Sequence, residues 1–377
     1  MSSRICLNCL KEVEGDLKCG KCRVARYCNR DCQVAHWSSH KNICYDSNSE
    51  DSTTKIAMKA ANLQQQGDFH KAQKLYNKLL GILRRAVGEN HRTYQVTLID
   101  LATSYFEQGK YAEAEILFKQ ILDKRVTSVG EKNHLEHHAA LNNLAAIYEM
   151  QGKHDKAEIL YKECLDTATG ETDTVKQRII CAAMTNLANI YSNQEKYAEA
   201  EILFKQCIEK QASLGQNHYS LNTQFNLAVC YNDQGKYAES VMLFKQTMDK
   251  QGSLLGKNHP DYLATMTNLS NTFVNHGKYA EAEMLCKQCL EKQRSLFGNN
   301  HPDCLNTMDC LAKTYSLQGK YAEADVLYKE CLEKQKLLFG NNYPDNPNTA
   351  RTKTGLVANY KRQGKFVEAI AVLKDTV

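Results

Sequence analysis

The first 44 residues hold seven of the sixteen cysteines of this 377-residue chain, and their spacing is that of metal ligands. A Cys-x2-Cys pair directs two sulfurs to one ion from a tight turn, whereas an x3 spacing places two ligands on one face of a helix. Both kinds of pair occur here, and one histidine completes a set of eight, enough for two tetrahedral zinc sites. The eight side chains are Cys6, Cys9, Cys19, Cys22, Cys28, Cys32, His40 and Cys44.

The four pairs can fill two sites in several ways, and the spacing alone does not choose among them. His36, four residues after Cys32, is an alternative ligand to His40. With four protein ligands each ion is closed to water, so the sequence predicts structural zinc and no catalytic metal. A segment this short buries little core, and zinc binding therefore supplies its folding energy.

The charge of this segment argues against a nucleic-acid reader. Residues 1–45 carry eight Lys/Arg and four Asp/Glu, most of the chain's formal charge of +5. Seven thiolates and two Zn²⁺ ions lower the charge of the loaded segment to about +1, which attracts phosphate only weakly. We therefore expect no direct contact with nucleic acid.

The order of the ligands resembles the MYND zinc finger, as do the sequence ARYC at 25–28, the Cys-Gln pair at 32–33 and Trp37. The resemblance implies a cross-brace in which Cys6, Cys9, Cys28 and Cys32 hold one zinc, and Cys19, Cys22, His40 and Cys44 hold the other. His40 is preferred to His36, because the first site then already has four thiolates. In MYND fingers a shallow groove at the Cys-Gln…Trp position takes short proline-rich peptides, which implies Gln33 and Trp37 as contacts. The alternative is that Trp37 only covers the small core of the finger.

After a polar linker at residues 46–53, the motif QGKYAEAEILFKQ of residues 108–120 recurs along the chain. A steady period near 42 residues indicates a repeat architecture. Apolar residues within a repeat follow helical spacing, and a glycine such as Gly152 ends the first helix. One helix has its apolar stripe at Leu141, Leu144, Ala145 and Tyr148, and the next at Ala157, Leu160, Tyr161 and Cys164. The aligned aromatic position falls at Phe69, Tyr111, His154, Tyr197, Tyr237, Tyr279, Tyr321 and Phe366. The sequence thus predicts about eight αα-hairpins stacked into a right-handed solenoid.

The pattern L-A-x-x-Y…G-x-Y-x-x-A resembles the tetratricopeptide repeat, and the joints GKNHPDY at 256–262 and GNNHPDC at 298–304 resemble the repeats of kinesin light chains. We therefore expect an all-α chain with a two-zinc MYND-type finger at 1–45, a linker at 46–53 and a tetratricopeptide repeat solenoid at 54–377. A zinc finger stands where kinesin light chains carry a long heptad segment, so no motor subunit is predicted.

The cysteines of the repeats call for a different interpretation from those of the finger. Cys164, Cys207, Cys289 and Cys331 share one position on the second helix, where these repeats usually have a small packed residue. Free cysteine behaves as a small hydrophobe, so core packing is predicted.

Asparagines line one face of several first helices. Asn143, Asn186, Asn226 and Asn268 each precede the repeated leucine, and Asn189, Asn193, Asn271 and Asn275 extend two of these columns at helical spacing. Asparagine is unfavourable inside a helix. In tetratricopeptide repeats these columns face the concave groove, where an amide can bind the backbone of an extended peptide. The alternative is a harmless solvated face copied by duplication. Lys313, Arg351 and Arg362 confine a site for a ligand's C-terminal carboxylate to the last two repeats.

These features favour a non-enzymatic adaptor that reads proteins or peptides through the finger and the groove. One alternative is a relative of SET-type protein lysine methyltransferases, in which MYND fingers are inserted; however, only five residues precede Cys6, and no β-rich segment is present. Another is a chromatin-bound co-repressor component. The N-terminus lacks the apolar region of a secretory signal, and no apolar run is long enough to cross a membrane, so we expect the cytoplasm or the nucleus.

Overall fold

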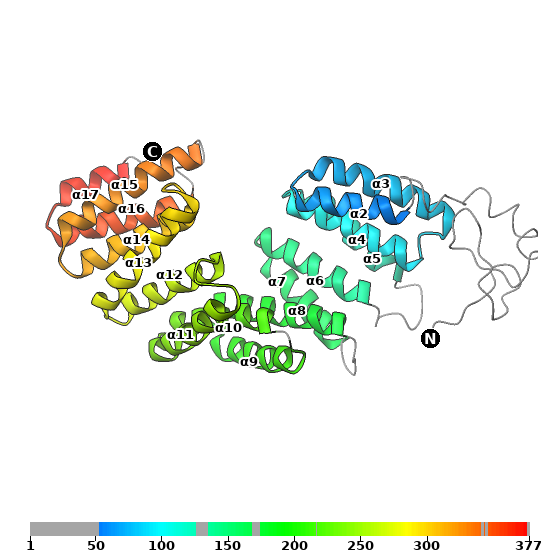
Figure 1. Ribbon diagram of the computed structural model, residues 1–377, viewed down its shortest axis with the longest axis horizontal. Coiled ribbons are helices and arrows are strands. Elements are labelled where there is room, and N and C mark those ends of the chain that lie inside the picture. Colours follow the sequence, from blue (N-terminus) through cyan, green and yellow to red (C-terminus); the bar gives the residue numbers. More distant parts are fainter. Residues whose placement is uncertain are drawn as a thin grey trace, which may run out of the picture. The chain divides into compact units, whose positions relative to one another are not determined.

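The computed structural model describes residues 53–125, 135–167, 174–215, 217–340, 343 and 346–374. These residues form sixteen α-helices and no strand, arranged as consecutive helical hairpins (Figure 1). The first helices of the hairpins are α2 (Thr53–Gln65), α4 (Arg92–Glu107), α6 (Leu135–Met150), α8 (Thr174–Asn193), α10 (Asn217–Asp233), α12 (Pro260–Asn275), α14 (Pro302–Leu317) and α16 (Pro347–Arg362). The second helices are α3 (Phe69–Ala86), α5 (Tyr111–Arg125), α7 (His154–Asp166), α9 (Tyr197–Ser213), α11 (Tyr237–Leu254), α13 (Tyr279–Phe297), α15 (Tyr321–Phe339) and α17 (Phe366–Lys374).

The predicted hairpins are confirmed in their detail. Every second helix begins at the residue that the repeat alignment marks, from Phe69 to Phe366. The turn before it needs a left-handed residue, which glycine supplies without steric cost, as at Gly152 with φ 72°. In the turn between α8 and α9 the sequence has Glu195 instead. Among the described residues it is the one non-glycine with a positive φ, at 61°.

Three of the later first helices begin in the same way. A side chain at the N-cap accepts a hydrogen bond from the backbone N–H two residues on, and proline follows at the first helical position. His259 Nδ1 does this at 3.2 Å in α12, His301 Nδ1 at 3.3 Å in α14, and Asn346 Oδ1 at 2.9 Å in α16. The histidine of the HPD joint is thus a helix cap.

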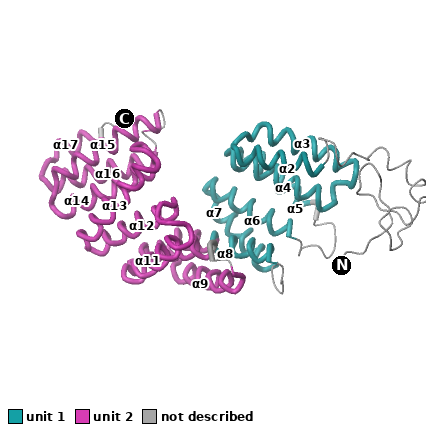
Figure 2. The backbone as a smooth tube through the Cα atoms, in the orientation of Figure 1, with its two compact units in different colours: residues 1–186 teal, residues 187–377 magenta. Residues whose placement is uncertain are grey.

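The chain forms two compact units, residues 1–186 (unit 1) and 187–377 (unit 2), each described here by itself (Figure 2). In unit 1 each helix from α2 to α7 packs against the next, and in unit 2 each from α9 to α17 does so. Within unit 2 the first helices α10, α12, α14 and α16 also contact one another in order, so they form one layer.

The core lies between first and second helices, and one repeated position on the second helices contacts the layer of first helices. A single position on the second helices is fully buried at Phe118 and Tyr161 in unit 1, and at Phe204, Phe244, Cys286 and Tyr328 in unit 2. At Tyr161, Cys286 and Tyr328 it contacts the residue before the repeated leucine of the next first helix. In unit 1 the hydroxyl of Tyr161 hydrogen-bonds to Asn186. In unit 2 Cys286 Sγ lies 3.4 Å from Cys310 Sγ.

The repeated cysteines pack in the core, as predicted. Cys164, Cys207, Cys289 and Cys331 are fully buried. Burial raises the pKa of the Cys164 thiol and that of the Cys331 thiol to about 12, so both stay protonated near neutral pH. In the described part of the chain no group of three or more His, Cys, Asp or Glu side chains could hold a metal ion.

Candidate functional site

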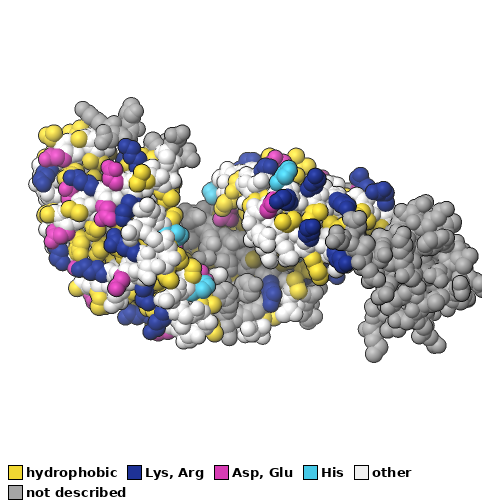
Figure 3. All heavy atoms as spheres, turned by 45° about the horizontal axis from the view of Figure 1, so that its top comes forward, with side chains coloured by type: hydrophobic (Ala, Val, Ile, Leu, Met, Phe, Trp, Pro, Cys, Tyr) yellow, Lys and Arg dark blue, Asp and Glu magenta, His cyan; other side chains and the backbone are white. Residues whose placement is uncertain are grey.

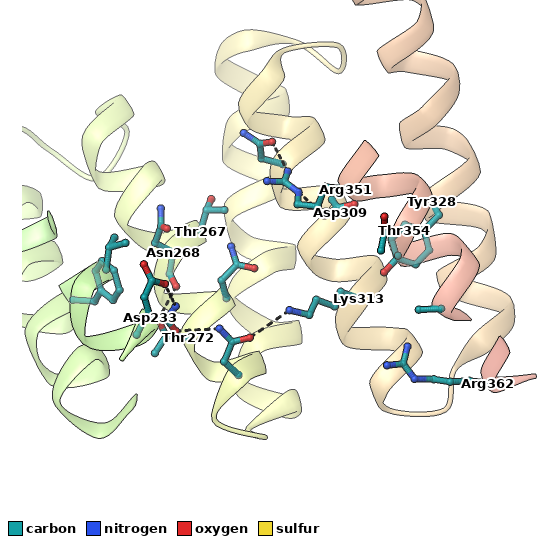
Figure 4. Close-up of a pocket in the computed structure, with 18 residues that line it drawn as sticks. Asp233, Thr267, Asn268, Thr272, Asp309, Lys313, Tyr328, Arg351, Thr354 and Arg362 are labelled. Atoms are coloured by element: carbon teal, nitrogen blue, oxygen red, sulfur yellow. Dashed lines mark hydrogen bonds and ion pairs between the residues drawn. The ribbon is translucent and has the colours of Figure 1, made fainter. Parts of the chain in front are cut away.

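A groove of about 580 Å³ runs along the layer of first helices in unit 2, from α10 to α16 (Figure 4). Asparagines from α12 form one wall, and basic residues from α14 and α16 form the other. The polar and charged residues that line it include Asn232, Asp233, Asn268, Asn271, Asn275, Asn306, Asp309, Lys313, Arg351 and Arg362.

The amide wall belongs to α12, whose asparagines are spaced three and four residues apart and so share one face. The amide of Asn268 donates to the backbone oxygen of Ala264 at 3.0 Å, which still leaves its carbonyl oxygen. Among the described residues Asn271 makes no side-chain hydrogen bond, and it is half-buried. This wall therefore has donor and acceptor capacity that the fold does not use.

A chain of hydrogen bonds crosses the groove at the C-terminal ends of three first helices. Asn275 Nδ2 donates to Asn232 Oδ1 at 3.1 Å, and Asn275 Oδ1 accepts from Lys313 Nζ at 3.3 Å. Asn232 Nδ2 in turn donates to Asp233 Oδ1 at 3.1 Å. The chain ties α10, α12 and α14 together and holds the ammonium of Lys313 over the groove.

The guanidinium of Arg351 is held at the opposite end by two groups of α14. Its Nε donates to Asp309 Oδ2 at 3.1 Å, and its Nη2 donates to Asn306 Oδ1 at 2.8 Å. Asp309 is only 8% exposed, and burial raises the pKa of its carboxyl, an effect that the nearby Arg351 opposes. Two contacts fix the plane of the guanidinium and leave further N–H groups for a ligand.

The third basic residue, Arg362, projects from the last turn of α16. Its Nη1 donates to the hydroxyl of Ser316 on α14 at 3.1 Å. Its partner is thus neutral, like the amide that holds Lys313.

On the second helices, called the outer helices here, lysines have carboxylate partners. On the second helices a lysine pairs with a carboxylate one turn earlier: Lys205 with Glu201 at 2.7 Å, and Lys287 with Glu283 at 2.6 Å. Hydrogen bonds from Lys287 and then Lys320 lower the pKa of Glu283 to about 2. In the face that Figure 3 presents, basic and acidic side chains are interspersed over unit 2. The outer charges are therefore locally neutralised, whereas the hydrogen-bond partners of Lys313 and Arg362 are neutral, and Asp309 interacts with Lys313 only through its charge.

The floor of the groove deepens at α16, where small residues replace the amides of α12. Gly355 occupies the repeat position of Asn268, and Ala358 that of Asn271. Tyr328 of α15 lies directly beneath, and a Cβ on Gly355 would stand 2.7 Å from its ring. Any larger residue at 355 requires the tyrosine to move.

The structure brings together only part of the predicted peptide contacts. Asn268, Asn271 and Asn275 line the groove, together with Lys313, Arg351 and Arg362 from the predicted carboxylate site. Asn189, Asn193 and Asn226 belong to unit 2 but do not line it, and Asn143 and Asn186 belong to unit 1. The eight predicted zinc ligands, Gln33 and Trp37 lie outside the described residues. The metal-binding role of the eight and the peptide-binding role of Gln33, Trp37 and the asparagines stay predictions.

Sequence reasoning missed Asn232, Asn306 and Asp309. They lie outside the columns next to the repeated leucine, and their signal is weak, because each faces a partner more than 40 residues away: Asn275 for Asn232, and Arg351 for the other two. The alignment of repeats could have found Asn306, which stands one repeat before Arg351.

Comparison with known families agrees with this architecture. The tetratricopeptide repeat model matches residues 52–125, 97–170, 179–251, 219–283 and 275–336, which together cover most of the chain. The chain belongs to the tetratricopeptide repeat family. The MYND finger model matches residues 6–44, so the tetratricopeptide repeat chain carries a MYND finger near its N-terminus. The predicted finger and repeats are thereby confirmed, and the finger implies zinc binding.

Curated relatives match the finger alone. The histone-lysine N-methyltransferase Smyd1 of Mus musculus is 45% identical over 40 residues, which are 11% of this chain and 8% of the relative. The N-lysine methyltransferase SMYD2-B of Danio rerio is 48% identical over 40 residues, again 11% of this chain and 9% of the relative. The chain thus spans less than a tenth of the length of these relatives.

Solved structures match the repeats. The apo quorum sensor NprR from B. thuringiensis is 13% identical, with a TM-score of 0.56 over 87% of this chain and 98% of that one. NprR in complex with its cognate peptide NprX is 15% identical, with a TM-score of 0.55 over 86% and 88%. Both likenesses show the fold alone. A putative kinesin light chain from Podosopora anserina, with nearly identical TPR-like repeats, is 24% identical over 55% of this chain and 99% of that one, with a TM-score of 0.48.

Proposed function

We propose that this protein is a non-enzymatic adaptor that binds an extended segment of a partner protein in the groove from α10 to α16. The observation that carries the proposal is the unused hydrogen-bonding capacity of the asparagine wall, above all Asn271. An amide both donates and accepts, and so it can pair with the N–H and C=O groups of an extended backbone whatever the side chains are. A solvated helix face would carry charged residues instead, as the outer helices do.

The basic wall gives the bound segment a chain direction. Lys313 and Arg362, which have neutral partners, favour an acidic group on the ligand, and a free C-terminal carboxylate is one such group. The description of NprR as a complex with a peptide supports peptide binding by this fold.

The finger adds a second surface to the proposed adaptor. Seven thiols and one imidazole are soft and borderline ligands that suit zinc, and together these eight groups hold two structural ions. Gln33 and Trp37 would then contact a proline-rich stretch of the same partner, and two weak sites on one chain gain affinity through effective concentration.

Free thiols in this number require a reducing compartment, the cytoplasm or the nucleus. The methyltransferase alternative gains no support, because its relatives match the finger alone.

The groove is tested with the double variant Asn268→Ala/Asn271→Ala. Partners are recovered by affinity purification of the full chain and identified by mass spectrometry, and the bound segment is then mapped with overlapping synthetic peptides. Because each lost hydrogen bond weakens binding by roughly 0.5–1.5 kcal/mol, the double variant should bind the mapped peptide about tenfold more weakly.

Asn258→Ala is the matched control. It also removes an asparagine amide, but Asn258 is exposed at a repeat joint, where it accepts from Lys292. Circular dichroism should show unchanged helicity for both variants. An unchanged affinity of the double variant, with an intact fold, would refute the groove as the binding site.

A further inference from the structure

Two of the basic residues in the groove lie against the same turn of α14. Arg362 Nη1 is 3.1 Å from the hydroxyl of Ser316, and Ser316 follows Lys313 by three residues, so both positions share one face of the helix. Lys313 itself projects into the groove and reaches Asn275. In Figure 4 the side chains of Lys313 and Arg362 both extend to the left, with Lys313 above and to the left of Arg362. The ammonium of Lys313 and the guanidinium of Arg362 thus lie along the α14 wall of the groove, and together they are called the Lys313–Arg362 subsite here.

The two cations of this subsite have neutral hydrogen-bond partners. The partners of its two cations are the Asn275 amide and the Ser316 hydroxyl. Two carboxylates also line the groove: Asp309 pairs with Arg351 and is also near enough to Lys313 to interact with its charge, and Asp233 accepts from Asn232. Three cations and two carboxylates line the groove, so it keeps a net positive charge that a ligand or solvent ions can balance.

The free hydrogen-bonding groups here are mainly donors. Lys313 uses one of its three N–H groups on Asn275, and Arg362 uses one of its five on Ser316. Ala358, which lines the groove one turn before Arg362, leaves space for a ligand group between them. The fitting ligand group is therefore a negatively charged one with several acceptor oxygens. A carboxylate has two oxygens and one charge, whereas a phosphorylated hydroxyl has three terminal oxygens and a charge of about −1.5 to −2.

We propose that the Lys313–Arg362 subsite binds the phosphoryl group of a phosphorylated serine or threonine in the partner segment, so that phosphorylation of the partner strengthens binding. This inference rests on the proposed binding of an extended segment in the groove, and it adds the chemical class of the ligand and a means of regulation.

The position of Arg351 adds a spacing rule. Arg351 precedes Arg362 by eleven residues on α16, or about 16 Å along the helix axis. It is held separately by Asp309 and Asn306 and so contacts a different residue of the ligand. An extended chain advances roughly 3.3 Å per residue. The partner segment should therefore carry an acidic residue about five positions from the phosphorylated one.

Three degenerate libraries of 15-residue fluorescent peptides test the subsite, with the central position fixed as phosphoserine, glutamate or serine. Fluorescence anisotropy with the full chain should rank phosphoserine first, about tenfold tighter than glutamate, and serine last. Lys313→Gln and Arg362→Gln should each remove most of the advantage of phosphoserine over serine.

Lys287→Gln is the control, because it removes a lysine that is already paired with Glu283 on the outer helix α13. It should leave all three affinities unchanged. Equal binding of the phosphoserine and serine libraries overturns the subsite while the proposed function stands. A phosphoserine preference that survives both groove substitutions also overturns it. If the glutamate library binds as tightly as the phosphoserine library, the subsite binds a carboxylate and the phosphoryl proposal is overturned. If no library binds, the proposed function fails together with the subsite.

Discussion

At the scale of single residues, the position before the repeated leucine shows how one site changes chemistry along the repeats. It is Asp100 in α4, asparagine in the next four first helices, and then Cys310 and Gly355. Its neighbour in the core changes with it, as when Cys286 faces Cys310 and Tyr328 lies against Gly355. The column is therefore part of the packing as well as part of the groove face, which the sequence pattern alone did not reveal.

Asp100→Asn should stabilise unit 1 in a pH-dependent way. Burial raises the pKa of the Asp100 carboxyl from its ordinary value of 3.8 to about 6. Between these two pH values the native state binds more protons than the unfolded state, so the free energy of unfolding falls as pH rises from 4 to 6, and the full penalty is present above pH 6. Asparagine removes the penalty and is the residue that the next four repeats carry.

We expect Asp100→Asn to raise the free energy of unfolding by about 1–2 kcal/mol at pH 7.5, with a gain that shrinks toward pH 4. Thermal unfolding followed by circular dichroism across this pH range checks it. Asp123→Asn, at an exposed position on α5, is the control. A gain of equal size at pH 7.5 and pH 4 would show that the charge of Asp100 is not the cause.

At the scale of helices, the sequence located the elements well because the physical signals are local. Glycine before every second helix except α9, proline after the caps of α12, α14 and α16, and apolar residues at helical spacing all act within a few residues. What local signals could not show is how closely neighbouring helices approach, which depends on side chains about one helix apart. Gly355 is such a case. Glycine is unfavourable inside a helix, and only the position of the Tyr328 ring, which packs against it, explains why it is there.

Gly355→Ala and Gly81→Ala should therefore have opposite effects, although both add a methyl group to a helical glycine. At Gly355 the new Cβ would lie 2.7 Å from the ring of Tyr328, and we expect a loss of about 1–3 kcal/mol in the free energy of unfolding. At Gly81 nothing lies within 4 Å, and the better helix propensity of alanine should add about 0.5–1 kcal/mol. Urea unfolding of the two variants measures both effects, and a stabilised Gly355→Ala would contradict the close packing of α15 and α16.

At the scale of the whole molecule, the finger and the repeats rest on different sources of stability. We expect the finger to depend on metal, whereas the repeats of each unit bury an apolar core. Among the described helices none has the combination of length and apolar character that crossing a bilayer requires.

Removing zinc should accordingly affect one part only. We expect a metal assay to give about two zinc ions per chain and a chelator to release them with little change in helicity or in the thermal transition of the repeats. Cys28→Ser should lower the zinc content in the same way. A collapse of helicity on chelation would show that the repeats depend on the finger.

The amino-acid sequence by itself determined the helices, the repeat period and the residue types of the groove, because each of these depends on spacings of a few residues or on a repeated motif. The zinc-ligand set stays a prediction from the same kind of spacing. Only the tertiary structure decided which of the asparagines meet the basic residues. The bonds that define the groove join residues 38 to 46 apart, Lys313 to Asn275 and Arg362 to Ser316 among them. Such pairs form only when neighbouring repeats stack in a particular register, and that register is set by the packing of side chains in the core.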